Sequence, residues 1–346
     1  MVFASGIFLF LFLPVTLLGT FFLKNKPVIY RNIFLLIMSF GFYLESGVKA
    51  TLLLMVSILA NYLLARLLAA VKLVKIKKIV LVIDIFYNIG MLFVFKYFTF
   101  VLEQLKQVVP GIGIVVSIAL PLGISFYIFQ ALSYVIDVYR DASKVEKNII
   151  NVALYISLFP QLVAGPIVRW ETVREKLRKP LAGDWNEGLA RFSIGLGKKV
   201  IIANQMAVFA DKAFKLLGES ELTTGFAWMG AIAYTMQIYF DFSGYSDMAI
   251  GLGEILGFEF PENFNYPYIS SSITEFWRRW HISLSSWFRD YVYIPLGGNR
   301  CSKGRMFFNL FVVWMLTGIW HGANYTFWIW GGYILYIPCD RKIVTA

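Results

Sequence analysis

The sequence predicts an all-α fold, a polytopic membrane bundle of helices, and two observations support this prediction: its composition and its long apolar runs. Of the 346 residues, 58% are hydrophobic and only 15% are charged, and the mean hydropathy is +0.66. A soluble globule needs more polar residues than this to cover its surface. The first apolar run, residues 3–23, can cross about 30 Å of hydrocarbon and lacks the basic start and cleavage site of a signal peptide. We therefore expect an integral membrane protein.

Basic residues between the apolar runs indicate the topology. The expected spans lie near residues 3–23, 32–45, 48–70, 79–101 and 113–136. Lysine and arginine collect in alternate loops, namely Lys24, Lys26 and Arg31, then Lys72, Lys75, Lys77 and Lys78, then Arg140, Lys144 and Lys147. The positive-inside rule places these loops in the cytoplasm and the N-terminus outside. The net charge of +11 is thus a topology signal, and we expect no nucleic-acid partner.

Beyond residue 148 the apolar pattern becomes irregular. The run 149–167 is broken by Pro160, Gly165 and Pro166, with Gln161 inside it, which favours a re-entrant segment. Such backbone is tolerated at membrane depth only where protein buries it or where it lines a cavity. Residues 186–216 mix lysine and arginine with apolar residues, which is typical of an interfacial helix, and residues 225–257 form a further span.

Two carboxylates, Asp241 and Asp247, lie in the last of these spans, with Ser243 between them. A carboxylate at such depth is costly, so each is expected to face a partner or a wet cavity. Pairing within the bundle and a direct catalytic role are both compatible with the sequence.

The segment 275–305 mixes arginine with tryptophan and tyrosine, as at the lipid headgroup level. One interpretation is an anchor helix that contacts anionic lipid. The other is a cationic rim for a phosphate-bearing donor such as coenzyme A or a loaded carrier protein. The rim residues would be Arg278, Arg279, Arg289, Arg300, Lys303 and Arg305, set among aromatic residues such as Trp280.

The chain has only two histidines, His281 and His321, each next to a tryptophan in an apolar setting. No charged residue other than His321 lies between Met306 and Tyr336, so its imidazole is expected to be neutral and able to accept a proton. A core histidine that only bonds to a neighbouring helix is the alternative. Two histidines and two cysteines are too few and too scattered for a structural zinc site, and we expect no metal.

Five motifs together resemble the membrane-bound O-acyltransferase family. They are PQLVAGPIVRW (160–170), IYFDFSGYSDMAIGLG (238–253), PENFNYPY (261–268), FWRRWHISLSSWFRDYVYIPLGGNR (276–300) and GIWHGANYTFWIWG (318–331). The sequence is most similar to the bacterial branch that acts in alginate O-acetylation, and more distantly to the membrane proteins of teichoic-acid D-alanylation. The resemblance runs from near the N-terminus to about residue 333.

This resemblance implies transfer of an acyl group, most simply acetyl, from a cytoplasmic thioester to a hydroxyl outside the bacterial cytoplasmic membrane. The donor would be acetyl-coenzyme A or an acyl carrier protein, with no permanently bound cofactor, and the acceptor an exported glycan or a relay protein. His321 matches the family's catalytic histidine, and His281 matches a second motif histidine that could position or polarise the thioester. A central tunnel would join both faces. Its expected lining is Pro160, Gln161, Gly165, Pro166, Asp241, Ser243, Asp247 and Asn324.

The resemblance also implies one domain over residues 1–346. Family members continue beyond the WHG motif with further membrane helices, whereas this chain reads GGYILYIPCDRKIVTA, so we expect a domain truncated at its C-terminus. Two other functions remain open. Broken helices and intramembrane carboxylates would also suit a transporter or flippase, although no inverted repeat is found. A noncatalytic scaffold subunit of a glycan-modifying complex is the third. The sequence does not name the acceptor.

Overall fold

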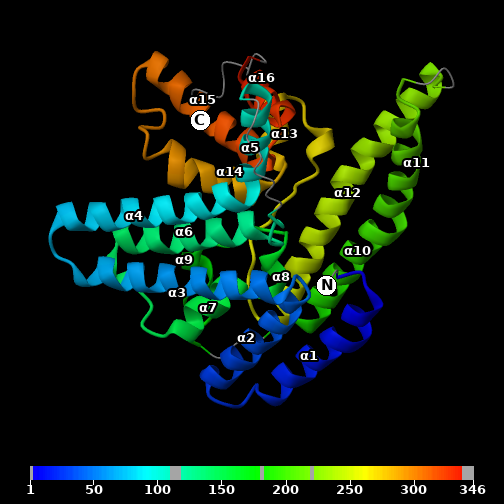
Figure 1. Cartoon of the computed structure of the whole chain (residues 1–346). Coiled ribbons are helices and arrows are strands. Elements are labelled where there is room, and N and C mark those ends of the chain that lie inside the picture. The colour runs from blue at the N-terminus through cyan, green and yellow to red at the C-terminus, as the bar shows by residue number, and fades with distance from the viewer. Residues whose placement is uncertain (1–2, 110–117, 180–182, 219–221, 337–346) are drawn as a thin grey trace. The chain divides into compact units, whose positions relative to one another are not determined.

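The computed structural model describes residues 3–109, 118–179, 183–218 and 222–336. Within these ranges the chain is helical, and the only extended pairing is an isolated bridge between Phe264 and Trp280. The predicted all-α fold is confirmed. The chain divides into two compact units, each described here by itself: a first unit of Met1–Glu45, Ser157–Val168 and Thr172–Asn263, and a second of Ser46–Ile156, Arg169–Glu171 and Phe264–Ala346 (Figure 1). The expectation of a single domain over residues 1–346 stays a prediction.

Helices make up most of the first unit. In chain order they are the π-helical turn η1 (Phe8–Phe12), α1 (Leu13–Phe22), α2 (Val28–Leu44), α8 (Phe159–Leu162), α10 (Trp185–Gly197), the π-helical turn η4 (Lys198–Ala203), α11 (Asn204–Lys215) and α12 (Thr224–Leu256). The expected spans 3–23, 32–45 and 225–257 thus correspond to helices. The expected amphipathic helix 186–216 corresponds to α10, η4 and α11, which run alongside α12 (Figure 1).

Glycines let α10 and α12 approach each other at backbone distance. A methyl group on Gly251 would lie 2.5 Å from the carbonyl oxygen of Gly188, and one on Gly195 would lie 2.6 Å from that of Gly244. Real side chains do not tolerate such distances, so this helix pair requires glycine at these positions. Helices in membranes commonly associate through small residues in this way.

Ion pairs join α10 and η4 to the two carboxylates of α12 that the sequence analysis singled out. Asp247 lies 2.6 Å from Lys198 Nζ and 3.3 Å from Arg191, and Asp241 lies 2.7 Å from Lys199 Nζ. The structure therefore shows both carboxylates paired within the first unit. Three cations that suggested an interfacial helix face α12 carboxylates instead.

The predicted break within residues 149–167 is present. Helix α7 (Ile149–Ser157) stops, Leu158 is non-helical, and Pro160 lies in the first turn of the four-residue helix α8. Proline has no amide hydrogen to donate, so it fits a helix start but not a helix interior. Gly165 then has a φ of 113°, which a residue with a side chain rarely adopts.

Long apolar helices dominate the second unit. Its helical segments are α3 (Val48–Ala70), α4 (Val74–Leu92), the π-helical turn η2 (Phe93–Tyr97), α5 (Phe98–Val108), α6 (Ile124–Arg140), the 3₁₀ turn η3 (Ala142–Lys144), most of α7, the start of α9 (Trp170–Val173), the 3₁₀ turn η5 (Pro267–Ile269), α13 (Ile273–Arg279), α14 (Ile282–Phe288), the π-helical turn η6 (Arg289–Tyr293), α15 (Lys303–His321) and α16 (Tyr325–Tyr336).

Two of these helices are long and apolar enough to cross a membrane, Val48–Ala70 and the continuous helix Val74–Val108. The second is longer than the expected span 79–101. The expected span 113–136 corresponds to α6 from Ile124 onwards, and its part at 113–117 lies outside the described residues. Helices α3, α4 and α6 lie side by side (Figure 1).

Buried amides join α3 and α4. Asn88 Nδ2 donates to Asn61 Oδ1 at 2.9 Å, and Asn61 Nδ2 donates back to Asn88 Oδ1 at 3.3 Å. Both residues are fully buried. A buried polar side chain is tolerated when its hydrogen bonds are made, so this reciprocal pair fixes the register of the two helices.

Replacing Gly251 by alanine tests the packing of α10 on α12. The added methyl group meets backbone of α10, which cannot yield like a flexible side chain. We expect Gly251→Ala to lower the free energy of unfolding in detergent by about 1–3 kcal/mol. Gly225→Ala, in the first turn of the same helix with no atom within 4 Å, is the matched control. It should be neutral or stabilising, because alanine favours helix over glycine by about 1 kcal/mol. Equal loss in both variants would contradict the packing argument.

Candidate active site

His281 lies between two short helices of the second unit. Ser272 Oγ accepts from the backbone N–H of Glu275 and so caps α13, which ends at Arg279. His281 precedes α14 and has a φ of 48°. A left-handed backbone is uncommon for residues other than glycine and collects at functional positions. His281 is 3% exposed, and its carbonyl oxygen accepts from the backbone N–H of Ser285 at 3.1 Å.

His321 is the last residue of α15, and the antiparallel helix α16 packs against it. A methyl group on Gly318 would lie 2.4 Å from the Phe327 carbonyl oxygen, and one on Gly331 would lie 2.6 Å from that of Trp314. This close approach brings the His321 ring edge-on to Trp330 at 5.2 Å and stacks it on Phe327 at 6.0 Å. His321 is exposed, and no hydrogen bond to its ring is found among the described residues. It is therefore not a core histidine held by a neighbouring helix.

Both histidines line one cavity of about 590 Å³ within the second unit. Trp320 bridges the pair, since its ring centroid is 5.7 Å from that of His281 and 5.0 Å from that of His321. The cavity walls are mainly aromatic and aliphatic, and hydroxyls such as those of Thr317 and Ser285 are placed on them. The structure thus brings together two imidazoles that lie 40 positions apart in the sequence.

The predicted donor-binding residues separate into two groups. Arg278, Arg289 and Trp280 line the cavity, and no ion-pair partner is found for Arg278 within the described part of the chain. Arg279 does not line it. Its guanidinium instead pairs with Glu275 and donates to the Asn265 carbonyl oxygen at 3.4 Å. These contacts give Arg279 a structural role, and its donor-binding role stays a prediction.

An ion-pair network holds the cavity segment that carries Arg289. Asp290 accepts from Arg289 Nε at 2.7 Å and from Arg169 Nη1 at 2.5 Å, and its carbonyl oxygen accepts from Arg140. Burial alone would raise the pKa of Asp290, but hydrogen bonds from Arg289 and Arg169 outweigh it and hold that pKa below its usual range. Asp290 is therefore ionised at neutral pH.

Sequence reasoning missed Lys96 and Tyr97, which contact the end of α15. Lys96 Nζ donates to the carbonyl oxygen of Trp320, and Tyr97 Oη donates to that of Ile319. The ammonium also lies 5.6 Å from the Trp320 ring centroid. The last carbonyls of a helix have no partner within the helix and carry partial negative charge, so a cation stabilises them. The sequence feature that could have revealed this contact is Lys96 itself, a single lysine inside the apolar run 79–101.

Most of the predicted tunnel residues belong to the first unit. Pro160 and Gln161 are buried in α8, Gly165 and Pro166 follow it, and α12 carries Asp241, Ser243 and Asp247. Asn324 belongs to the second unit, where its Oδ1 accepts from the backbone N–H of Thr326 at 2.9 Å at the start of α16. The tunnel itself stays a prediction. No cluster of residues suited to a metal ion is found among the described residues.

The helical fold with long apolar helices, and a histidine pair in one mainly apolar cavity, define a class of helical membrane proteins with an imidazole site. Residues 35–339 match the sequence profile of the membrane-bound O-acyltransferase family. The chain belongs to this family, and it is a membrane protein.

Two curated relatives that act in O-acetylation match nearly the whole chain, and a more distant one matches part of it. It is 47% identical over 340 residues to a probable alginate O-acetylase AlgI of Pseudomonas aeruginosa, a match that covers 96% of this chain and 64% of that protein. It is 37% identical over 362 residues to a peptidoglycan O-acetyltransferase of Helicobacter pylori, covering 96% and 68%. It is 30% identical over 224 residues to a teichoic acid D-alanyltransferase of Bacillus subtilis, covering 61% and 56%. The chain thus spans about two thirds of the length of its acetyltransferase relatives.

Replacing Gly331 by alanine tests whether the close contact between α15 and α16 stabilises the fold. The added methyl group would force the two backbones apart. We expect Gly331→Ala to lower the free energy of unfolding by about 1–3 kcal/mol, measured by thermal denaturation in detergent. Gly332→Ala is the matched control, because its nearest neighbour is Met315 Sδ at 3.8 Å. A Gly331→Ala protein as stable as Gly332→Ala would show that the contact is not required.

Proposed function

We propose that this chain is the acyl-transfer part of a membrane O-acyltransferase. It moves an acetyl group from a cytoplasmic thioester donor to a hydroxyl of an exported or cell-surface polysaccharide, or of a relay partner. Its location would be the bacterial cytoplasmic membrane, with several spans. The observation that carries this proposal is the one cavity that holds His281, His321, Arg278 and Arg289.

The reaction needs a base where the acceptor hydroxyl meets the thioester. In the proposed step the His321 imidazole takes the hydroxyl proton as the oxygen attacks the thioester carbonyl carbon. A C–O bond forms, the C–S bond breaks, and the proton passes from His321 to the departing sulfur. The products are an ester and a free thiol. His321 is the better base candidate because it is exposed to the cavity, whereas His281 is buried.

His281 suits a positioning or polarising role. Its backbone is fixed by the turn between α13 and α14, and its ring lies against Trp320 beside the base. A preorganised donor near the carbonyl oxygen would stabilise the negative charge that develops there. This role is proposed from its position alone.

Arg278 and Arg289 supply the charge for a phosphate-bearing donor. Arg289 shares its charge with Asp290, whereas no carboxylate pairs with Arg278 among the described residues. An unpaired guanidinium can bind a phosphate through two parallel hydrogen bonds. Coenzyme A and the phosphopantetheine group of a carrier protein both carry a phosphate, which the pantetheine arm separates from the thioester, so Arg278 would bind the donor away from the reacting carbonyl.

The acceptor class is proposed from the relatives. Two of them are named for acetylation of alginate and of peptidoglycan, and both polymers offer sugar hydroxyls outside the cytoplasm. Acetyl is therefore the favoured group. No observation favours a transporter, because Asp241 and Asp247 are engaged in ion pairs, and none favours a scaffold, because both histidines line a cavity.

Removing the proposed base should stop transfer. We expect His321→Gln to reduce acetyl transfer by about 10²- to 10⁴-fold, which is the usual contribution of a positioned general base. The measurement is incorporation of label from [¹⁴C]acetyl-coenzyme A or labelled carrier protein into cell-surface glycan by membranes that contain the variant.

Phe311→Ala is the control for this experiment. It lies on the same helix, is 43% exposed and does not line the cavity, so parental activity is expected. His321→Gln that folds and transfers acetyl at the parental rate would refute the assignment.

Removing the guanidinium of Arg278 should weaken binding of the donor more than it slows the acyl-transfer step. We expect Arg278→Gln to raise the donor KM by on the order of 10-fold, with a smaller change in kcat, because a charge-assisted hydrogen bond contributes about 1.5–3 kcal/mol and part of this is lost to solvent at an exposed site. Arg300→Gln removes the same charge from an exposed residue of the same unit that does not line the cavity, and the donor KM of this variant should stay parental. Equal KM values for the two variants would exclude Arg278 from the donor site.

A further inference from the structure

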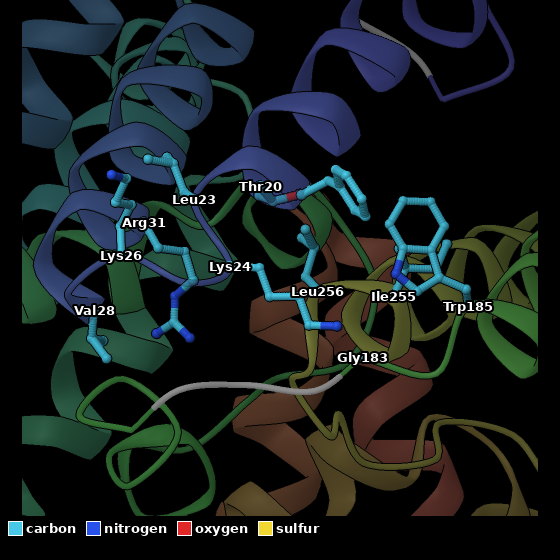
Figure 2. Close-up of a pocket in the computed structure, with 11 residues that line it drawn as sticks. Thr20, Leu23, Lys24, Lys26, Val28, Arg31, Gly183, Trp185, Ile255 and Leu256 are labelled. Atoms are coloured by element: carbon cyan, nitrogen blue, oxygen red, sulfur yellow. The ribbon is translucent and has the colours of Figure 1, made fainter.

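A second cavity lies wholly within the first unit, beside the loop between α1 and α2 (Figure 2). Its volume is about 410 Å³. Three cations line it, Lys24, Lys26 and Arg31, and no acidic residue is found among the described residues of its wall. The proposed acyl transfer uses none of these residues, so this cavity is distinct from the candidate active site.

Arg31 is a nearly buried cation without a counter-ion. It is 8% exposed. Its guanidinium donates to Asn32 Oδ1 at 2.7 Å and to the carbonyl oxygens of Lys176 and Lys179 at 3.2 Å each. All of these acceptors are neutral, and no carboxylate pairs with Arg31 among the described residues. A buried charge is costly unless an opposite charge accompanies it, so the site favours an anion.

Lys24 and Lys26 add to this excess of positive charge. Both are exposed, and neither ammonium pairs with a carboxylate among the described residues. Other lysines of the same unit do pair, as Lys176 does with Glu259 at 2.6 Å. Figure 2 shows Lys24 extending into the space between Arg31 on one side and Trp185 on the other. The positive charge of these lysines is therefore at the cavity, and no carboxylate among the described residues neutralises it.

The rest of the cavity wall is mainly apolar and continues onto an exposed apolar surface. It consists of Phe21, Leu23, Val28, Trp185, Ile255 and Leu256, together with Thr20 and Gly183. On α1, Leu18, Phe21 and Phe22 are 57%, 60% and 73% exposed. A ligand with an anionic group and an alkyl chain would place its charge against the cations of the cavity and its chain against the apolar wall. The basic loop is also predicted to face the cytoplasm, where the leaflet holds anionic lipids.

We propose that this cavity binds a phosphate group through Arg31, Lys24 and Lys26. The phosphate would come from the headgroup of an anionic phospholipid or from a soluble phosphate compound. The apolar wall and the exposed face of α1 favour the lipid source.

Lipid binding by the detergent-purified full chain tests this proposal. Native mass spectrometry would titrate the protein with phosphatidylglycerol and, in parallel, with zwitterionic phosphatidylcholine. The Lys24→Gln/Lys26→Gln variant should bind phosphatidylglycerol on the order of 25-fold more weakly, about 5-fold for each lysine removed. Arg31 is left intact in this variant, because its hydrogen bonds hold α2 to the segment that contains Lys176 and Lys179.

Two further variants separate the cavity from general surface charge. Lys75→Gln/Lys78→Gln removes the same charge from exposed, unpaired lysines at the start of α4, and it should bind as the parental chain does. Val28→Trp fills the cavity without changing its charge and should also weaken binding.

Competition identifies the source of the phosphate. Displacement of phosphatidylglycerol by millimolar glycerol phosphate, with the same loss in the Lys24→Gln/Lys26→Gln variant, would support a soluble ligand. Binding that needs the acyl chains would support the lipid. Equal binding of both lipids, or an equal loss in the two lysine-pair variants, would overturn the proposal.

Discussion

The candidate active site depends on one backbone contact, the approach of α15 to α16 at Gly318 and Gly331. Each glycine lies so close to the opposite helix that a methyl group would overlap a carbonyl oxygen. The contact places the end of α15, and so His321, against Phe327 and Trp330 from the other helix. Because two packed helices form the wall, the imidazole has aromatic neighbours on one side and the cavity on the other.

Charge in an apolar environment is stabilised in two ways in this chain. In the first, Arg191, Lys198 and Lys199 neutralise carboxylates of α12, so charge pairs with charge at 2.6–3.3 Å. In the second, Lys96 instead binds the carbonyl end of a helix. Carbonyls carry only partial charge, so much of the positive charge of Lys96 remains beside Trp320, next to the histidine.

Much of the fold followed from the sequence, because apolar runs and proline or glycine breaks act locally. Residues 48–70 formed the expected helix, and the run 149–167 was interrupted next to Pro160 as expected. The shared cavity of His281 and His321 was expected only from family resemblance, since periodicity carries no information on contacts 40 positions apart. Lys96 was overlooked for the same reason: its partner carbonyls lie more than 220 positions away. Arg278 and Arg279 appeared equivalent in the sequence. In the structure Arg279 forms an ion pair with Glu275, whereas Arg278 lines the cavity.

The π-helical turn at 93–97 has a consequence for how this chain can change through evolution. Such a turn amounts to one extra residue in an otherwise α-helical rod, and neighbouring residues Lys96 and Tyr97 both reach successive carbonyls of α15 from it. Deleting a single residue there would restore regular winding and rotate the preceding helix by about 100° against the following one. Insertions and deletions in this short stretch should therefore be far rarer than point substitutions.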